Sequence, residues 1–150
     1  MSSHDSRPDG AALSRSVLGA IMGIVVGGIL ISLFQMFGHR LVPLPPEIAQ
    51  LPPERCSDAI KLLRPSQLVL MAGAQFLGAA AGAALAAAVA KRLWLLHSGM
   101  VAAVFMAGAV FNVSRCAYPT WYVALSLSSF VAAALVGSRF AAAADERTAS

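Results

Sequence analysis

The feature that most constrains this chain is a pair of long apolar segments separated by only two residues. Leu68–Ala90 and Leu93–Val113 contain no charged side chain, and only Lys91 and Arg92 lie between them. About 20 consecutive apolar residues are enough to cross the hydrocarbon core of a bilayer as a helix. The sequence therefore predicts two membrane-spanning helices that are joined by a tight basic turn.

Two further apolar segments bring the predicted number of spans to four. Val17–Phe37 is longer than the apolar region of a cleaved signal peptide. Only 12% of the residues are charged and 58% are hydrophobic, whereas a soluble domain carries about 25% charged residues. The predicted fold class is all-α, a polytopic membrane protein with a four-transmembrane-helix bundle. Its transmembrane domain covers 17–139, with helices at 17–37, 68–90, 93–113 and 119–137.

Three segments lie outside the predicted spans. Residues 1–16 are expected to form a disordered tail, and residues 140–150 a polar C-terminal tail. The loop 38–66 is rich in Pro, which disfavours helix at the preceding residue, so its first half should be extended. From Pro53 to Leu63 the pattern favours a short amphipathic helix at the membrane surface, with a substrate-binding lid as the alternative.

The orientation is predicted from the placement of basic residues. Four spans put both chain ends on the same side as the Lys91-Arg92 turn. The cations on that side are Arg7, Arg15, Lys91, Arg92, Arg139 and Arg147, and five lie on the other side. The two counts are too similar to decide the orientation. A compact basic turn directly at the membrane, however, favours a cytoplasmic location for the side that carries Lys91 and Arg92. We therefore expect a multi-pass protein of the bacterial inner membrane with both termini cytoplasmic and the 38–66 loop periplasmic. Trp94, Trp121 and Tyr122 suit the two interfaces.

Small residues recur at every fourth position in each predicted span, which places them on one helix face. Apolar side chains gain nothing by leaving lipid for protein, so close backbone approach has to supply the association. The sets are Gly19, Gly23 and Gly27; Ala74, Gly78 and Gly82; Gly99, Ala103 and Ala107; and Ser129, Ala133 and Gly137. We expect packing within the chain, with self-association or a protein partner as the alternative use of these faces.

Groups that could carry chemistry are scarce in the predicted spans. Charged groups inside a bilayer mark functional sites, and these spans contain no Asp, Glu, Lys or Arg. The intramembrane polar residues are Gln75, Asn112, Ser126, Ser128 and Ser129. We interpret them as interhelical hydrogen-bonding groups worth about 0.6 kcal/mol each, with a hydrophilic pathway as the alternative. His97 is interpreted as a histidine that is merely accommodated, and no cofactor or catalytic motif is predicted.

His39, Cys56 and Cys116 all fall on the side of the long loop. Neutral His and thiolate are metal ligands, but these residues are dispersed and lack ligand spacing, so we predict no metal site. A disulfide between Cys56 and Cys116 is the favoured hypothesis. It requires the loop to face an oxidising compartment.

Three stretches of the chain resemble a family of small bacterial inner-membrane proteins with four helices and no assigned activity. They are LFQMFGHRLVPLPP, GAQFLGAAAGAALAA and AGAVFNVSRCAYPTWYVAL, and the resemblance covers most of Val17–Ala141. Family members tend to have an acidic residue at the position of Gln35, and Pro-His-Pro-x-Trp where this chain has Ala117–Trp121. The resemblance implies a four-helix membrane fold and no reaction, and this chain lacks both ionisable groups.

The favoured function is an integral inner-membrane protein without enzymatic activity, a structural or accessory subunit of a larger membrane assembly or of a homo-oligomer. The alternative is a small oligomeric channel or carrier for a neutral or apolar solute. A membrane enzyme that uses His39 or Cys116 ranks last. The basic residues form no stripe, so the lipid bilayer is an expected partner and nucleic acid is not.

Overall fold

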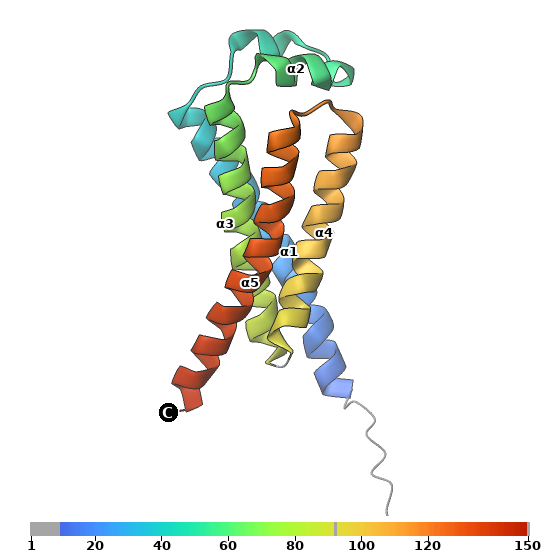
Figure 1. Ribbon diagram of the computed structural model, residues 1–150. Coiled ribbons are helices and arrows are strands. Elements are labelled where there is room, and N and C mark those ends of the chain that lie inside the picture. Colours follow the sequence, from blue (N-terminus) through green and yellow to red (C-terminus); the bar gives the residue numbers. More distant parts are fainter. Residues whose placement is uncertain (1–9, 92, 150) are drawn as a thin grey trace, which may run out of the picture.

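A computed structural model describes residues 10–91 and 93–149 and shows an all-α bundle (Figure 1). The bundle is formed by four long helices: α1 (Gly10–Leu41), α3 (Pro65–Ala90), α4 (Trp94–Arg115) and α5 (Thr120–Ala149). Each of them is long and apolar enough to span a membrane. The predicted fold class is confirmed. By helix length and hydropathy the chain is a multi-pass membrane protein that contacts the lipid bilayer.

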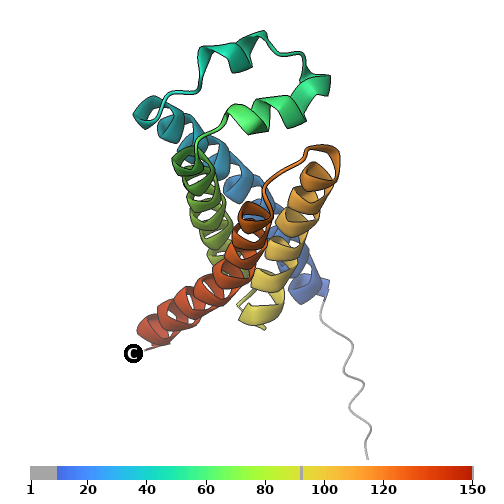
Figure 2. The ribbon, with the colours of Figure 1, turned by 45° about the horizontal axis from the view of Figure 1, so that its top comes forward.

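The segment 42–64, which we call the cap, lies across one end of the bundle (Figures 1 and 2). It contains two short 3₁₀ turns, η1 (Pro46–Gln50) and η2 (Pro53–Arg55), followed by α2 (Cys56–Leu62). The single helix expected from Pro53 to Leu63 is thus divided between η2 and α2. The described ends of the chain and the turn after α3 lie at the opposite end of the bundle (Figure 1).

Both outer helices are longer than predicted. The expectation of a disordered tail over 1–16 is wrong for residues 10–16, which belong to α1, while 1–9 lie outside the described residues. The expected polar tail 140–150 is also helical as far as Ala149. Ala is the strongest helix former, and adding residues to an existing helix is far easier than nucleating one. The Ala141–Ala144 run therefore continues α5 beyond its predicted end at residue 137.

Helix α3 is central, because it packs against each of the other three long helices. Its contact with α1 is the closest and has three levels. A Cβ atom added to Gly23 would lie 2.5 Å from the Gly82 carbonyl oxygen. One turn to either side, a Cβ on Gly19 would lie 2.9 Å from the Ala86 oxygen, and a Cβ on Gly27 would lie 3.0 Å from the Gly78 oxygen. The two backbones touch at these levels, so Gly19, Gly23 and Gly27 of α1 leave no room for a larger side chain.

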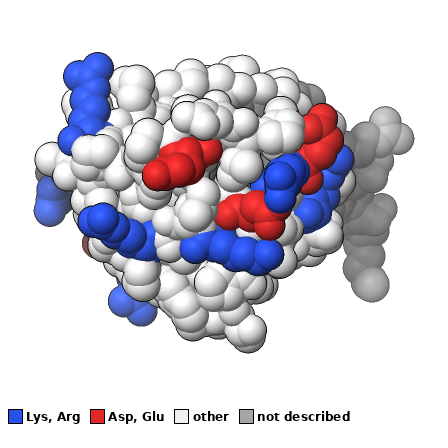
Figure 3. Space-filling view, turned by 90° about the horizontal axis from the view of Figure 1, so that it is seen from above, with Lys and Arg blue, Asp and Glu red and all other residues white. Residues whose placement is uncertain are grey.

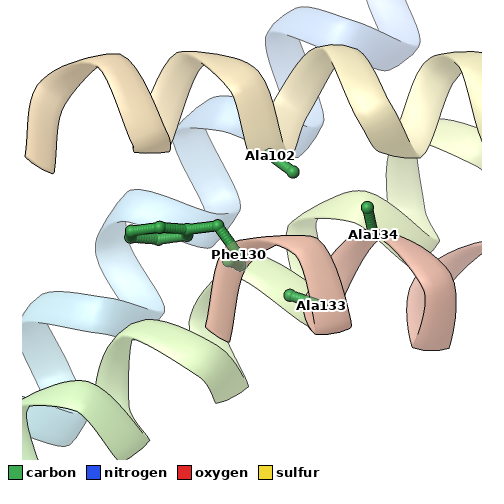
Figure 4. Packing of buried hydrophobic residues seen from close by; sticks show 5 residues of the cluster. Ala102, Phe130, Ala133 and Ala134 are labelled. Carbon is green, nitrogen blue, oxygen red and sulfur yellow. The ribbon is translucent and has the colours of Figure 1, made fainter. Parts of the chain in front are cut away.

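Helix α3 also packs against α5 and α4. A Cβ atom on Gly137 would be 2.8 Å from the Ala83 Cβ, so α5 also approaches α3 through a small residue. Figure 4 shows that Ala102 of α4 points toward the buried Phe130 and Ala134 of α5. The Phe105 ring of α4 stacks with Phe130 at a centroid distance of 6.4 Å. These contacts make an apolar core around small side chains.

The third predicted set of small residues does not form the contact face of α4. A Cβ atom on Gly99 would meet nothing within 4 Å, and Ala103 and Ala107 are exposed on the outside of the bundle. Helix α4 packs instead through the buried Val101 and Ala102. The residues that contact the bundle lie beside the predicted small residues around the helix, and they include larger side chains. The bulky Val101 and the ring of Phe105 fill the space against Gly23 and Gly27 of α1, which the small residues of the predicted face would leave empty.

The α1–α3 contact makes a direct prediction for substitutions in α3. Gly82→Ala should lower the free energy of unfolding in detergent by about 1–3 kcal/mol, the usual penalty of overpacking, because its Cβ would overlap the backbone of Gly23. Gly73→Ala is the matched control, since a Cβ there meets nothing within 4 Å. Equal losses for the two variants, measured by denaturant titration, would contradict this packing.

Candidate functional site

A group of polar side chains joins α3 to α5 within the bundle. The Ser126 hydroxyl donates a hydrogen bond to Oε1 of Gln75 at 2.7 Å, and Nε2 of Gln75 donates to the Tyr122 hydroxyl at 3.4 Å. Tyr122 and Ser126 are one helical turn apart and are only 3% and 2% exposed. Ser129 donates to the Ser126 carbonyl oxygen at 2.7 Å. The Gln75 amide is therefore satisfied by protein groups within the spans.

The remaining predicted polar residues lie elsewhere. Nδ2 of Asn112 donates to the Tyr118 hydroxyl at 3.2 Å near the cap end of α4. Ser128 is exposed and donates to the Leu125 carbonyl oxygen of its own helix. The five residues therefore do not converge on one pathway. The Asn112 pair is connected to the Gln75 group by stacking of the Tyr118 and Tyr122 rings, whose centroids are 5.0 Å apart.

The two tyrosines carry this arrangement, and sequence reasoning assigned only an interfacial role to Tyr122 and none to Tyr118. The spacing of Tyr122 and Ser126 by four positions places both on one helix face and could have indicated their joint contact with Gln75. Burial raises the pKa of Tyr118, while the hydrogen bond from Asn112 opposes the shift. The phenol therefore stays neutral at physiological pH.

Two more polar groups are buried near the opposite end of α4. The Ser98 hydroxyl donates to the Ala83 carbonyl oxygen at 3.1 Å and links α4 to α3. Nδ1 of His97 lies 3.2 Å from the Leu93 carbonyl oxygen of the preceding turn. His97 thus contacts the backbone of its own helix. Ser98 was not predicted as a contact residue.

The cap is joined to the bundle by a disulfide between Cys56 and Cys116, whose Cα atoms are 5.6 Å apart. Cys56 begins α2 and Cys116 directly follows α4. Beside the bond, the Ala117 N–H donates to the Ser57 hydroxyl at 3.0 Å. The structure thus brings together the two cysteines that the sequence paired, and it leaves neither thiol free to bind a metal. His39 lies instead beside a narrow hollow between α1 and α3, together with Gln35 and Gln67.

The other edge of the cap is held at the start of α3. Gln67 is 3% exposed; its Oε1 accepts a hydrogen bond from the Arg64 N–H at 2.7 Å, and its Nε2 donates to the Pro43 oxygen at 2.8 Å. Acidic and basic side chains lie next to one another on the cap end (Figure 3). Lys61 and Arg55 both pair with Asp58 and lower the pKa of its carboxyl. These exposed pairs stabilise α2 itself and do not dock it.

The hydrogen bond between Ser126 and Gln75 can be measured with a double-mutant cycle. We expect Ser126→Ala and Gln75→Leu each to destabilise the protein, with a coupling energy of about 0.6 kcal/mol and at most about 1.7 kcal/mol, the range for such bonds in membranes. Ser128→Ala is the control, because Ser128 bonds only to its own helix. A coupling energy of zero in lipid would show that the contact does not form.

Comparisons with protein-family models, with curated proteins and with solved structures found no match to this chain. The resemblance drawn from the sequence therefore identifies no family. The four long apolar helices support only its coarse content, a small four-helix membrane protein. Any function has to be argued from the residues described above.

Proposed function

We propose that this protein is a non-enzymatic component of a membrane assembly, which associates with a further transmembrane helix through the outer face of α4. The support is the selective use of small residues. The predicted small-residue faces of α1, α3 and α5 are engaged in contacts within the chain at Gly19, Gly23, Gly27, Gly78, Gly82 and Gly137, whereas Ala103 and Ala107 of the predicted α4 face are exposed and Gly99 has open space beside it. This uncovered face is the observation that carries the proposal, because small residues let a second helix approach closely in lipid.

The polar residues of the spans favour the same role. Gln75 and Ser126 bond to each other, and the hydroxyl of Ser98 bonds to a backbone oxygen. Groups satisfied in this way hold helices together and leave little capacity to bind a solute. A channel or carrier lined by Gln75, Asn112 and Ser126–Ser129 receives less support, because Asn112 and Ser128 lie apart from the Gln75 group.

The same proposal places the protein in the bacterial inner membrane with both termini in the cytoplasm. The disulfide supports this orientation, since such bonds form and persist in oxidising compartments such as the periplasm, and the Cys56–Cys116 bond lies at the cap end. The basic turn at Lys91 lies at the opposite end, as expected for a cytoplasmic side.

A reporter fused after Ser150 tests the orientation. A fluorescent protein that matures only in the cytoplasm should be bright at this position, because α5 ends on the side of Lys91. The same reporter inserted after Gln50, in the cap, should stay dark. A dark C-terminal fusion with a bright cap insertion would reverse the orientation.

The proposed interface predicts a specific effect of a bulky residue on α4. Ala103→Leu should weaken association in lipid vesicles at least about tenfold, or about 1.4 kcal/mol, because the side chain would separate the helices. Ala81→Leu is the matched control, since Ala81 is exposed on α3. Self-association is measured by energy transfer between labelled copies, and a different partner by its co-purification. If Ala103→Leu changes neither, the α4 face is not an interface.

A further inference from the structure

The cap is held to the bundle by few contacts other than its covalent bond. Among residues 42–64, all of which the structure describes, only Ile60 is buried. Apart from backbone bonds at its junctions with α1 and α3, the hydrogen bonds that join this segment to the rest of the described protein run from Ala117 to Ser57, from Gln67 to Pro43 and from Arg64 to Gln67. The ion pairs around Asp58 lie within the cap itself. Apart from the main chain itself, the disulfide is therefore the strongest link between α2 and the bundle.

The position of the bond makes it the attachment point of α2. This helix has 7 residues, and isolated helices shorter than about 12–15 residues are marginal in water. Its first residue, Cys56, is bonded to the connection between α4 and α5. Without this bond, α2 would retain the burial of Ile60, the packing of Leu63 at its C-terminal end and the hydrogen bond at Ser57 to keep it docked.

We infer that the Cys56–Cys116 disulfide is a redox-operated latch, which keeps the cap closed over the end of the bundle and releases it when a dithiol reduces the bond. This inference goes beyond the proposed assembly role and does not depend on any partner. If the bond were not a latch, its reduction would leave the cap closed, because the non-covalent contacts would keep α2 in place.

The exposure of the two cysteines indicates how the latch would open. Cys116 is buried at 8% exposed, whereas Cys56 is partly exposed. A thiolate of the dithiol attacks the sulfur of Cys56, forms a mixed disulfide, and displaces the Cys116 thiolate, which takes up a proton. The second thiol of the reductant then attacks the reductant sulfur that is bonded to Cys56, and Cys56 is released as a thiol. The reductant becomes a disulfide, and two electrons and two protons have passed to the protein.

Release of the cap would expose a cluster of side chains at the cap end of the bundle. Leu63, at the end of the cap, packs with Tyr118 and Met71 around the buried Leu68 and Tyr122. Tyr122 is also the hydrogen-bond acceptor of Gln75. The latch thus controls access to the part of the bundle where its polar side chains begin.

Amide hydrogen exchange of the full-length protein in lipid nanodiscs tests the latch, with dithiothreitol as the dithiol. In the oxidised protein the amides of Ile60–Leu63 should be protected. After reduction they should exchange at least roughly tenfold faster, while amides of the α3 segment 78–87 keep their rates. Reoxidation should restore the protection.

Two variants make the outcome decisive. Cys56→Ser/Cys116→Ser lacks the bond and should exchange rapidly in α2 with or without dithiothreitol. Ser57→Ala keeps the bond but loses the hydrogen bond, so it should stay protected until it is reduced. If reduced wild-type protein keeps the oxidised exchange rate in α2, non-covalent contacts suffice and the latch is refuted. If the amides of α3 accelerate together with those of α2, the bond stabilises the whole bundle, and the latch is refuted as well.

Discussion

The contact between α1 and α3 is the interaction on which the rest of the bundle depends. In lipid, two helices gain little by burying apolar side chains, so they must gain from close van der Waals contact. Three successive levels of glycine and alanine bring the two backbones into that contact, with Gly23 against Gly82 at the centre. Because α3 also touches α4 and α5, the position of α1 against it sets the geometry of the other helices.

The polar side chains add specificity to this packing. A glycine face alone allows helices to slide past each other by one turn, whereas the Ser126–Gln75 hydrogen bond joins one position of α5 to one position of α3. The Ser98–Ala83 bond does the same for α4. Both bonds engage groups that would otherwise be unsatisfied in an apolar environment. They are consistent with a scaffold, and the Ser126–Gln75 bond extends through Gln75 to Tyr122.

The proposed assembly role and the proposed latch use different ends and faces of the molecule. The uncovered small residues of α4 lie along the side of the bundle within the spans, where another helix could approach. The disulfide lies at the cap end, where water and a reductant can reach Cys56. The two proposals therefore make independent demands on the protein, and one can fail without affecting the other.

The sequence by itself determined the fold class and the number of spans, because run length and charge depend only on local composition. It made the Cys56–Cys116 disulfide a hypothesis, since both cysteines fall on the same side of the predicted spans, and the tertiary structure brings them together. The sequence also indicated the residues of the α1–α3 contact. Only the tertiary structure decided which face of α4 packs, because the large side chains of Val101 and Phe105 compete with the small residues beside them for the space against α1. The same holds for Tyr118 and Tyr122, whose stacking depends on how the connection after α4 positions the start of α5.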